Sequence, residues 1–352
     1  MIILDDHKLN YHLDRVQAWL NGERIAPITM DIALTRACTY NCIYCYSKLQ
    51  KNKSKVLTWN VIKRFLDDAR EIGVKAISLV SDGESTCSPH VYNTILYGKE
   101  IGLDMALGTN GYLLKDDRLI EILPKLSYIR FNVSAATPKW YAKIHGCDEK
   151  CYHKVVGTIK KCVAIKKKHK LNVTIGMQMV LHPDYIHDII PLCELGRDLG
   201  IDYFIIKHCS DDEDGSLEVD YSKYLYIKDI LKDAESFTMG DYQVSVKWSK
   251  ILDGRNRTYS HCYGPPFIMQ LSGSGLVAPC GMLFNERYAK YHIGNIVDTS
   301  FKELWKGERY WKVMKMLAED HNVYKCGSLC LQHNVNQFLD GLRKIPKHVN
   351  FV

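Results

Sequence analysis

The most informative part of the chain is the stretch ITMDIALTRACTYNCIYCY at residues 28–46. Its first seven residues are mostly apolar and predict a strand, and Cys38, Cys42 and Cys45 follow directly. Loops at the carboxyl ends of parallel strands are where open sheets and barrels place their chemistry. Three clustered thiolates suit an iron–sulfur cluster or zinc. A zinc knuckle or a set of buried free cysteines remains the structural alternative, although this loop offers zinc no fourth ligand.

Apolar and amphipathic segments alternate through the first two-thirds of the chain. Short apolar runs predict strands at residues 28–34, 75–80, 103–107, 128–133, 173–180 and 203–207. Amphipathic segments predict helices near residues 61–72, 91–101, 118–123, 155–168, 186–199 and 221–231. This alternation implies a parallel sheet, because parallel neighbours need helical crossovers. The pattern predicts an α/β fold, either an open doubly wound sheet or a complete or partial (β/α) barrel.

Composition excludes several classes of protein. The 352 residues are 46% hydrophobic and 25% charged, which excludes disordered and collagen-like chains. No apolar run approaches the roughly 18–20 residues of a membrane helix, and the first ten residues do not resemble a secretory signal. We therefore expect a cytoplasmic protein in which metal binding, rather than disulfide formation, explains the 13 cysteines. The net charge of +7 allows anionic partners without requiring them.

The pattern changes after about residue 238. Residues 267–278 predict a β-hairpin, with Gly273 and Gly275 in the turn, and residues 301–317 predict a helix. We expect three parts: a capping segment at 1–27, an α/β domain at 28–240 and a small cysteine-bearing domain at 241–352. The last part contains four cysteines, Cys262, Cys280, Cys326 and Cys330.

The Cys-x3-Cys-x2-Cys spacing, with an aromatic residue before the last cysteine, resembles the radical S-adenosylmethionine (radical SAM) superfamily. The resemblance covers residues 28–210 and implies a partial (β/α)6 TIM-type barrel. It also implies a [4Fe-4S] cluster with three cysteine ligands, whose open iron binds S-adenosylmethionine (SAM). In that family, an electron from the cluster cleaves SAM to methionine and a 5′-deoxyadenosyl radical, which abstracts a hydrogen atom from an unactivated carbon.

Polar residues after the later strands extend this resemblance. The segment Ser81-Asp82-Gly83-Glu84 is similar to the family's Gly-Gly-Glu segment, which receives the SAM amino group, although Asp82 replaces the usual glycine. An ammonium group needs acceptors, and a carboxylate beside an exposed turn supplies them. The resemblance implies further cofactor contacts by Tyr44, Asn110, Ser134 and Gln178.

The second cysteine set resembles the SPASM and twitch domains that follow the barrel in a large branch of radical SAM enzymes. Full SPASM domains have seven cysteines and two auxiliary clusters, whereas only four cysteines follow residue 240 here. The resemblance implies one auxiliary [4Fe-4S] cluster with Cys262, Cys280, Cys326 and Cys330 as ligands; the role of Cys326 is left open. A four-cysteine zinc site is the alternative that the spacing also allows.

Four residues are candidates for proton or hydrogen-atom transfer. His208, Lys207 and His145 are candidate bases for an oxidation, because their side chains can exchange protons near neutral pH. Cys87, three residues after Glu84, is a candidate hydrogen-atom donor for an epimerisation, with a buried thiol as the alternative. The acidic run 211–215 is either a solvated loop or a contact with a cationic substrate or the auxiliary domain.

These features together predict a radical SAM enzyme acting on a small molecule of the sugar, aminocyclitol or nucleotide type, by oxidation or epimerisation. The resemblance also implies a one-electron donor such as flavodoxin or ferredoxin. Modification of a peptide is the alternative within the class, and we expect no separate peptide-recognition domain before residue 28. RNA modification is disfavoured, because the basic residues are scattered. A non-catalytic zinc-binding protein is the alternative from another class.

Overall fold

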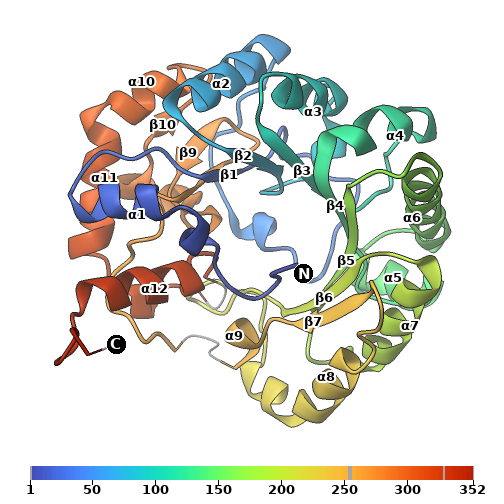
Figure 1. The fold of residues 1–352 in the computed structure, drawn as a ribbon. Coiled ribbons are helices and arrows are strands. Elements are labelled where there is room, and N and C mark those ends of the chain that lie inside the picture. The colour runs from blue at the N-terminus through green and yellow to red at the C-terminus, as the bar shows by residue number, and fades with distance from the viewer. Residues whose placement is uncertain (1, 253–255, 328–329, 352) are drawn as a thin grey trace.

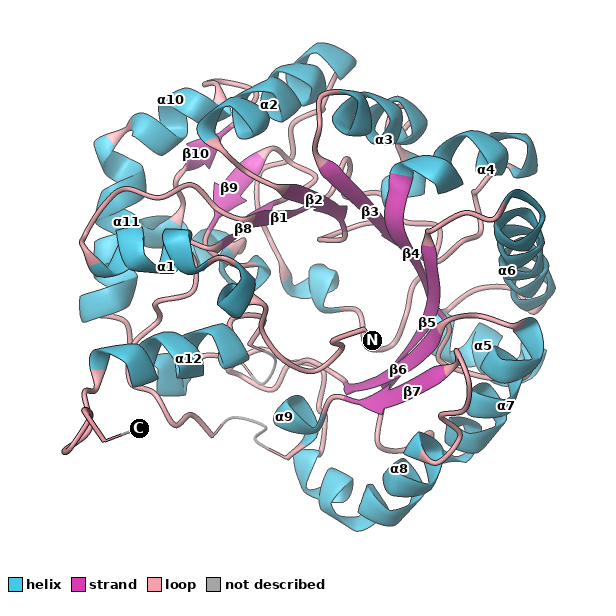
Figure 2. Cartoon of the chain, in the orientation of Figure 1, coloured by secondary structure: helices cyan, strands magenta, loops and turns pink. Residues whose placement is uncertain are grey.

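The computed structural model describes residues 2–252, 256–327 and 330–351. These residues form one ten-stranded sheet in the order β10-β9-β8-β1-β2-β3-β4-β5-β6-β7. Figures 1 and 2 show the strands curving around a central space, with helices on the outside. The predicted α/β class with a parallel sheet is therefore confirmed, in the form of a partial barrel.

The strands and helices have the following bounds. The strands are β1 Thr29–Ile32, β2 Ala76–Leu79, β3 Asp104–Thr109, β4 Leu126–Asn132, β5 Thr174–Leu181, β6 Tyr203–His208, β7 Gln243–Val246, β8 Ile268–Leu271, β9 Leu276–Ala278 and β10 Gly294–Asn295. The α-helices are α1 Leu13–Leu20, α2 Trp59–Ile72, α3 Val91–Glu100, α4 Asp116–Ile122, α5 Pro138–His145, α6 Lys150–His169, α7 Ile189–Leu199, α8 Lys228–Glu235, α9 Trp248–Ile251, α10 Phe301–Lys306, α11 Glu308–Glu319 and α12 His333–Arg343.

The barrel sheet extends beyond the six strands expected from the sequence. All six expected strands are present, and β7 adds a seventh that pairs in parallel with β6. The expected domain boundary at residue 240 therefore falls one strand too early. On the other side, β8 pairs in parallel with β1, and β9 and β10 continue the sheet in antiparallel pairing. The C-terminal hairpin is thus an extension of the barrel's own sheet.

The hydrophobic core lies between the strands and the outer helices. In α2, Ile62, Phe65, Leu66 and Ala69 are buried at helical spacing, and the helix ends at Gly73 in the left-handed region (φ 103°). Full burial of each larger side chain in this stripe is worth about 1.5–3 kcal/mol. This apolar stripe is what holds the helix against the outside of the sheet.

The inner side of the barrel is different in character. Along β4, Ile129 and Phe131 are completely buried. Arg130 and Asn132, which alternate with them, are partly accessible and line a central cavity. Side chains alternate between the two faces of a strand, so the outward residues pack against helices and the inward ones face the barrel interior. The barrel interior is therefore polar and hollow at this level, as a ligand-binding barrel requires.

The two ends of the chain share a small second core. Val16 of α1 packs with Phe267 before β8 and with Val335 and Leu339 of α12. Figure 1 shows α1 and α12 on the same side of the molecule. The expected capping segment thus rests on the C-terminal part of the chain.

The helix expected at residues 301–317 is divided. Gly307, in extended conformation (φ −68°, ψ 148°), separates α10 from α11. Across the described ranges, we find no helix with the length and apolarity needed to span a membrane.

Candidate active site

The three cysteines of the first motif lie together in the loop at the carboxyl end of β1. Cys38, Cys42 and Cys45 line a single cavity, and all three are free thiols. Burial first, and then neighbouring thiols, raise the pKa of Cys38 to about 11 and that of Cys42 to about 12. The thiolates of Cys38 and Cys42 are therefore unstable here without a cationic partner, which a bound metal cluster would provide by displacing the thiol protons.

Hydrogen-bond donors surround these sulfurs. The Tyr40 backbone N–H donates to Cys38 Sγ at 3.4 Å, and the Ser47 hydroxyl lies 3.0 Å from Cys45 Sγ. Donors of this kind orient cluster ligands and tune the cluster's reduction potential.

His145, at the end of α5, supplies the donor for Cys42. Its Nε2 accepts a hydrogen bond from the Ser134 backbone N–H at 3.1 Å, which places the proton of the neutral ring on Nδ1. That Nδ1 lies 3.4 Å from Cys42 Sγ and 3.4 Å from the Tyr44 hydroxyl. Burial lowers the pKa of His145 to about 3, so the ring is neutral at ordinary pH. The geometry thus aims an N–H bond at a cluster ligand.

Glu84 lies beside the cysteine loop with part of its carboxylate available. Oε1 accepts hydrogen bonds from the Thr86 N–H (3.0 Å), the Thr86 hydroxyl (2.7 Å) and the Thr109 hydroxyl (2.7 Å). Oε2 accepts one from the Asn110 N–H at 2.7 Å. Because Oε2 accepts fewer hydrogen bonds than Oε1, it retains capacity for a further donor such as an ammonium group. The role of Glu84 in SAM binding stays a prediction.

Gly83 and Asp82 show why this turn departs from a double glycine. Gly83 has a φ of +97°, and a Cβ on it would lie 2.2 Å from the Thr35 carbonyl oxygen, so no larger residue fits. Asp82 turns instead toward the C-terminal hairpin, where it accepts from the Ser272 hydroxyl (2.6 Å) and the Gly273 N–H (2.9 Å). Asp82 was expected to bind the cofactor, whereas in the structure its carboxylate holds the hairpin against the cysteine loop.

The other expected cofactor residues occupy the carboxyl ends of the strands. The Ser134 hydroxyl donates to the Tyr44 hydroxyl at 3.2 Å, and the Gln178 amide donates to Asn132 Oδ1 at 2.9 Å. Asn110 donates to the Thr39 hydroxyl at 3.0 Å. Of the expected set, those that line the cavity are Tyr44, Ser81, Asp82, Gly83, Glu84, Asn110 and Gln178. Ser134 does not line it directly and acts through its partners.

The four C-terminal cysteines also converge. Cys262 precedes β8, Cys280 follows β9, and Cys326 and Cys330 flank the segment before α12. Burial raises the pKa of Cys262, and the other three thiols raise it further. All four line the cavity.

Three of these sulfurs have a hydrogen-bonding neighbour. Asn336 donates to Cys262 at 3.7 Å, Tyr259 donates to Cys330 at 3.5 Å, and His321 Nε2 lies 3.1 Å from Cys326. Cys326, whose role the sequence left open, therefore sits within the set. The group has the donor chemistry of a cluster site.

A single metal ion suits these cysteines less well than a cluster does. Within residues 2–252, 256–327 and 330–351, no three His, Cys, Asp or Glu side chains are placed to share one ion. A polynuclear cluster distributes its ligands over several iron atoms, so it accepts more widely spaced sulfurs. The two cysteine sets have the thiolate ligands that iron–sulfur clusters use.

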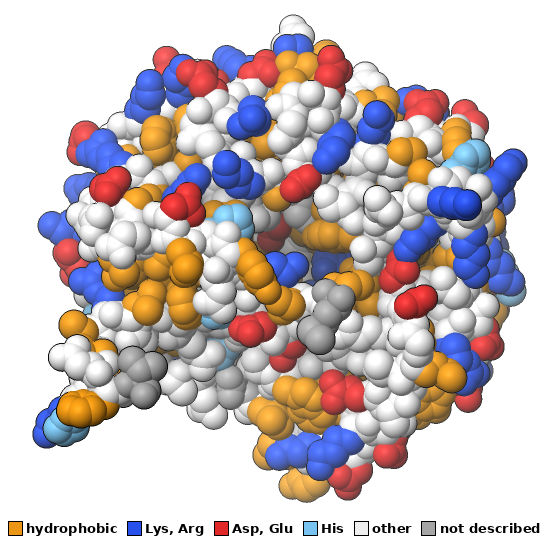
Figure 3. All heavy atoms as spheres, in the orientation of Figure 1, with side chains coloured by type: hydrophobic (Ala, Val, Ile, Leu, Met, Phe, Trp, Pro, Cys, Tyr) orange, Lys and Arg blue, Asp and Glu red, His pale blue; other side chains and the backbone are white. Residues whose placement is uncertain are grey.

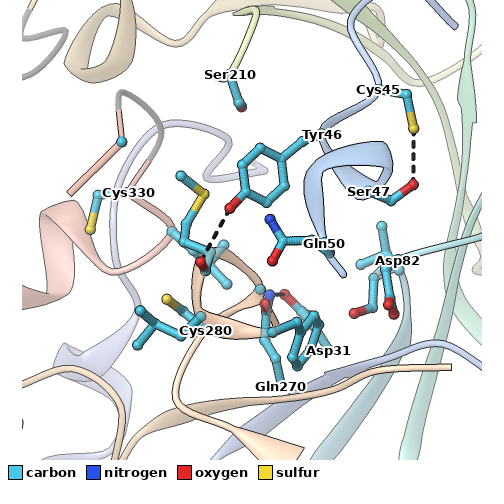
Figure 4. A pocket seen from close by; sticks show the side chains of 18 of the residues that line it. Asp31, Cys45, Tyr46, Ser47, Gln50, Asp82, Ser210, Gln270, Cys280 and Cys330 are labelled. Carbon is cyan, nitrogen blue, oxygen red and sulfur yellow. Dashed lines mark hydrogen bonds between the residues drawn. The ribbon is translucent and has the colours of Figure 1, made fainter. Parts of the chain in front are cut away.

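Both cysteine sets open into the same cavity, which has a volume of about 420 Å³. Figure 4 shows Tyr46 in the middle of this space, with Cys45 on one side and Cys280 and Cys330 on the other. The Tyr46 hydroxyl donates to the Met282 carbonyl at 3.2 Å. A substrate held in this cavity would therefore be within reach of both sites.

The candidate proton-transfer residues are placed differently from one another. Lys207 lines the cavity, and burial together with nearby cations lowers its pKa to about 7. His208, the next residue on β6, is fully buried on the opposite face against the rings of Tyr221 and Tyr224. Cys87 is half-buried near Cys38 and is not among the cavity residues. Of the expected bases, Lys207 and His145 thus face the cavity, and His208 does not.

Three inward-facing residues were not predicted from the sequence as site residues: Asp31, Arg130 and Gln270. Asp31 on β1 accepts from the Gln270 amide at 3.3 Å, and burial raises its pKa to about 6. The available signal was a charged or polar residue at every second position inside an apolar strand, which is typical of a residue facing a barrel interior.

Comparisons with known proteins agree with this architecture. A family model described as the radical SAM superfamily matches residues 32–195, and one described as an iron–sulfur cluster-binding domain, SPASM, matches residues 262–331. The first covers the cysteine loop and most of the barrel, and the second covers all four C-terminal cysteines.

Two curated relatives illustrate the range of similarity. An AdoMet-dependent heme synthase of Methanosarcina barkeri is 23% identical over 86% of this chain and 88% of its own length. A probable GTP 3′,8-cyclase of Thermococcus kodakarensis is 31% identical over 42% of this chain and 48% of its own length. The alignment therefore spans about half of the cyclase.

Solved structures share the fold at low sequence identity. Streptococcus suis SuiB bound to S-adenosylmethionine has a TM-score of 0.66 and 16% identity, over 90% of this chain and 76% of SuiB. The protein anSMEcpe with bound AdoMet has a TM-score of 0.58 and 15% identity, over 92% of this chain and 98% of anSMEcpe.

Proposed function

Because the chain belongs to the radical SAM superfamily and carries a C-terminal SPASM domain, we propose that it cleaves SAM reductively to start a radical reaction on a small molecule. In this proposal Cys38, Cys42 and Cys45 hold the catalytic [4Fe-4S] cluster, and the four C-terminal cysteines hold an auxiliary one. When bound, the first cluster and SAM would supply a 5′-deoxyadenosyl radical able to abstract a hydrogen atom from carbon.

The observation that carries this proposal is the shared cavity. The two cysteine sets, Glu84 and Asn110 line one space, although residues 38 and 330 are almost the whole chain apart. A cluster that served only to stabilise the fold would not need to face the cofactor site. The common cavity supports an auxiliary cluster that exchanges electrons during the reaction.

The chain's own residues have separable roles in this scheme. Oε2 of Glu84 would accept hydrogen bonds from the SAM ammonium group, and the Asn110 side chain would help to close this end of the cavity. His145 would hold Cys42 through its Nδ1–H bond. Tyr44, joined to both Ser134 and His145, would fix the wall on the opposite side.

The named relatives favour a small molecule over a peptide as the substrate. Curated relatives named as a heme synthase and a GTP cyclase agree with a small-molecule substrate. A peptide is the second candidate, because SuiB has also been crystallised with a precursor peptide.

Among net reactions, oxidation is better supported than epimerisation. Asp31, with a pKa raised to about 6, lines the cavity and titrates close enough to neutral pH to accept a proton. Cys87, which an epimerisation would use as a hydrogen-atom donor, is not among the cavity residues.

Anaerobic reconstitution tests the proposal directly. With iron, sulfide and dithionite, the full chain should release 5′-deoxyadenosine from SAM, measured by chromatography. The Cys42→Ala variant should release none, because one of three cluster ligands is lost, whereas Cys193→Ala, which removes a buried thiol on α7, should match the wild type. Release by Cys42→Ala at the wild-type rate would refute the assignment of the first motif.

A further inference from the structure

The wall of the cavity contributed by β4 to β6 carries two partly buried cations. Arg130 on β4 and Lys207 on β6 both line the cavity. Arg130 comes four residues before Ser134, which places it about 13 Å closer to the amino end of the strand. Arg130 therefore lies deeper in the barrel than Ser134, whereas Lys207 pairs in register with Val180, whose N–H donates to the Ser134 hydroxyl.

In the described part of the chain, neither cation forms an ion pair. Among the described residues, no carboxylate lies within ion-pair distance of the Arg130 guanidinium or the Lys207 ammonium group, and Arg130 Nε is buried without a hydrogen bond. Burial, followed by the proximity of Arg130, Lys247 and Lys250, lowers the pKa of Lys207 to about 7. A buried, uncompensated cation is costly, so its retention indicates that something else supplies the negative charge.

A glycine lies on each side of Arg130 in the sheet. In the parallel register, Arg130 lies between Gly108 on β3 and Gly176 on β5. Neither glycine has a positive φ, so the conformation does not require glycine at these positions. A Cβ at Gly108 would lie 2.9 Å from Val80 Cγ2 and in ordinary contact, at 3.5 Å, with Arg130 Nη2; one at Gly176 would overlap the Tyr203 ring, 2.1 Å from its Cζ. The two glycines thus leave room for the Val80 and Tyr203 side chains on either side of Arg130.

The local charge balance is positive. Lys247 and Lys250 lie close enough to lower the pKa of Lys207. Arg130 and Lys207 in turn act against the burial that raises the pKa of Asp31. Figure 3 shows a hollow near the centre of the visible face, with Lys and Arg side chains inside it. Clefts lined by one sign of charge attract ligands of the opposite sign.

We propose that Arg130 and Lys207 form an oxyanion subsite that binds a carboxylate or phosphate group of the substrate. This inference rests on the proposed function and names the substrate class: a small molecule with at least one such group. Asp31, across the cavity and hydrogen-bonded to Gln270, then faces the uncharged, reacting part of the substrate. A planar guanidinium and an ammonium group are the side chains that proteins use for this recognition.

Calorimetric titration of the reconstituted, SAM-loaded protein with two probes tests the subsite. The probes are pyrophosphate and glutarate, which represent the phosphate and carboxylate sources. Arg130→Gln and Lys207→Met should each lower the affinity for the more tightly bound probe at least about tenfold, the equivalent of one charged hydrogen bond. Arg130→Lys should recover part of this lost affinity. The exposed cations provide matched controls, Arg197→Gln and Lys168→Met, which should bind the probe as the wild type does.

A second readout separates a binding subsite from a structural role. If the cations wait for a ligand, Lys207→Met should raise the thermal midpoint of the ligand-free protein, because an unpaired buried charge is removed. A lowered midpoint together with unchanged probe affinity would overturn the proposal. If the Lys207→Met variant lost SAM affinity and kept its probe affinity, the proposal would also be overturned, because Arg130 and Lys207 would then belong to the cofactor site.

The two proposals fail in different ways. Absence of 5′-deoxyadenosine from the wild-type protein would count against the proposed function. Equal binding of both probes by wild type, Arg130→Gln and Lys207→Met would refute the oxyanion subsite, whatever the outcome of the cleavage assay.

Discussion

At the scale of single residues, the site is built from side chains with fixed hydrogen-bond roles. His145 is the clearest case, because the Ser134 N–H occupies its Nε2 and leaves only Nδ1–H to face Cys42. The sequence suggested a catalytic base at this position. The structure offers a different explanation, since both nitrogens are engaged and the pKa is lowered to about 3 by burial.

Substitution of His145 should change the potential of the catalytic cluster. His145→Phe removes the N–H···S hydrogen bond to Cys42, so the sulfur carries more charge and the cluster becomes harder to reduce. We expect the midpoint potential to fall by about 40 mV, the equivalent of one net hydrogen bond of about 1 kcal/mol. A redox titration followed by electron paramagnetic resonance measures it. His145→Gln, which can still donate, is the control, and an unshifted potential in His145→Phe would contradict the assigned tautomer.

Glu84 gives a second prediction at this scale. Glu84→Gln keeps an acceptor oxygen for the Thr86 and Thr109 donors and gives up the Asn110 N–H contact, whereas Glu84→Ala would leave all of these donors unpaired. It removes the charge that the SAM ammonium group needs, so the Kd for SAM should rise about ten- to a hundredfold. Equilibrium dialysis of the reconstituted protein measures this, with iron content as the control. Unaltered SAM affinity at full iron content would exclude Glu84 from the cofactor site.

At the scale of secondary-structure elements, the notable feature is how the hairpin after β8 docks on the cysteine loop. A Cβ on Gly273 would lie 2.1 Å from the Thr35 backbone carbon, so hairpin and loop are in direct backbone contact. The Asp82 carboxylate also connects the two: it accepts hydrogen bonds from the hairpin and lies 3.3 Å from Nε of Arg36 in the loop. A polar bond between residues 82 and 272 thus ties the second cysteine set to the first.

Another link joins the loop after β6 to the C-terminal part. Arg287 pairs with Asp212, Glu213 and Asp214 at 3.6, 3.0 and 2.5 Å. Asp212 is almost fully buried, so this acidic run is no solvated loop. Of the alternatives considered from the sequence, contact with the auxiliary domain describes it.

Asp82→Ala should loosen the hairpin specifically. Removal of the carboxylate leaves the Gly273 N–H and the Ser272 hydroxyl unpaired in a buried place, at a cost of about 1–3 kcal/mol each. We expect faster hydrogen exchange in residues 272–278 and a lower thermal midpoint. Asp298→Ala, which breaks an exposed ion pair with Lys55, should leave both nearly unchanged. Equal exchange in the two variants would argue against Asp82 as the tie.

Local pattern predicted the six first barrel strands, because each is an apolar run bounded by turn residues and followed by an amphipathic helix. It missed β7, since Gln243–Val246 is short and alternates polar with apolar residues, without an apolar run. It also joined α10 and α11, because Gly307 interrupts the helix by adopting extended geometry, which a hydrophobic period does not reveal. The contact between Asp82 and the hairpin could not be predicted for another reason: its partner lies 190 residues away, and no local pattern encodes such a contact.

At the scale of the whole molecule, the chain closes on itself around one cavity. The sheet carries the hairpin from β8 directly beside β1, and α1 packs against α12, so both termini brace the same region. Motif spacing could predict both cysteine sets, but not that they would share one cavity. That result depends on the continuous sheet, in which β8 pairs with β1, and β9, which Cys280 follows, pairs in antiparallel fashion with β8.

The auxiliary site can be tested separately from the catalytic one for this reason. Cys280→Ala should remove about four irons and the matching sulfide per chain, because a four-iron cluster seldom persists on three ligands in a site built for four. SAM affinity should persist, since Glu84 and the first motif are intact. Iron, sulfide and zinc analysis of the reconstituted protein measures this, with Cys193→Ala as the matched loss of a buried thiol. Loss of one zinc instead would establish a structural metal site, and an unchanged iron count would remove Cys280 from the ligand set.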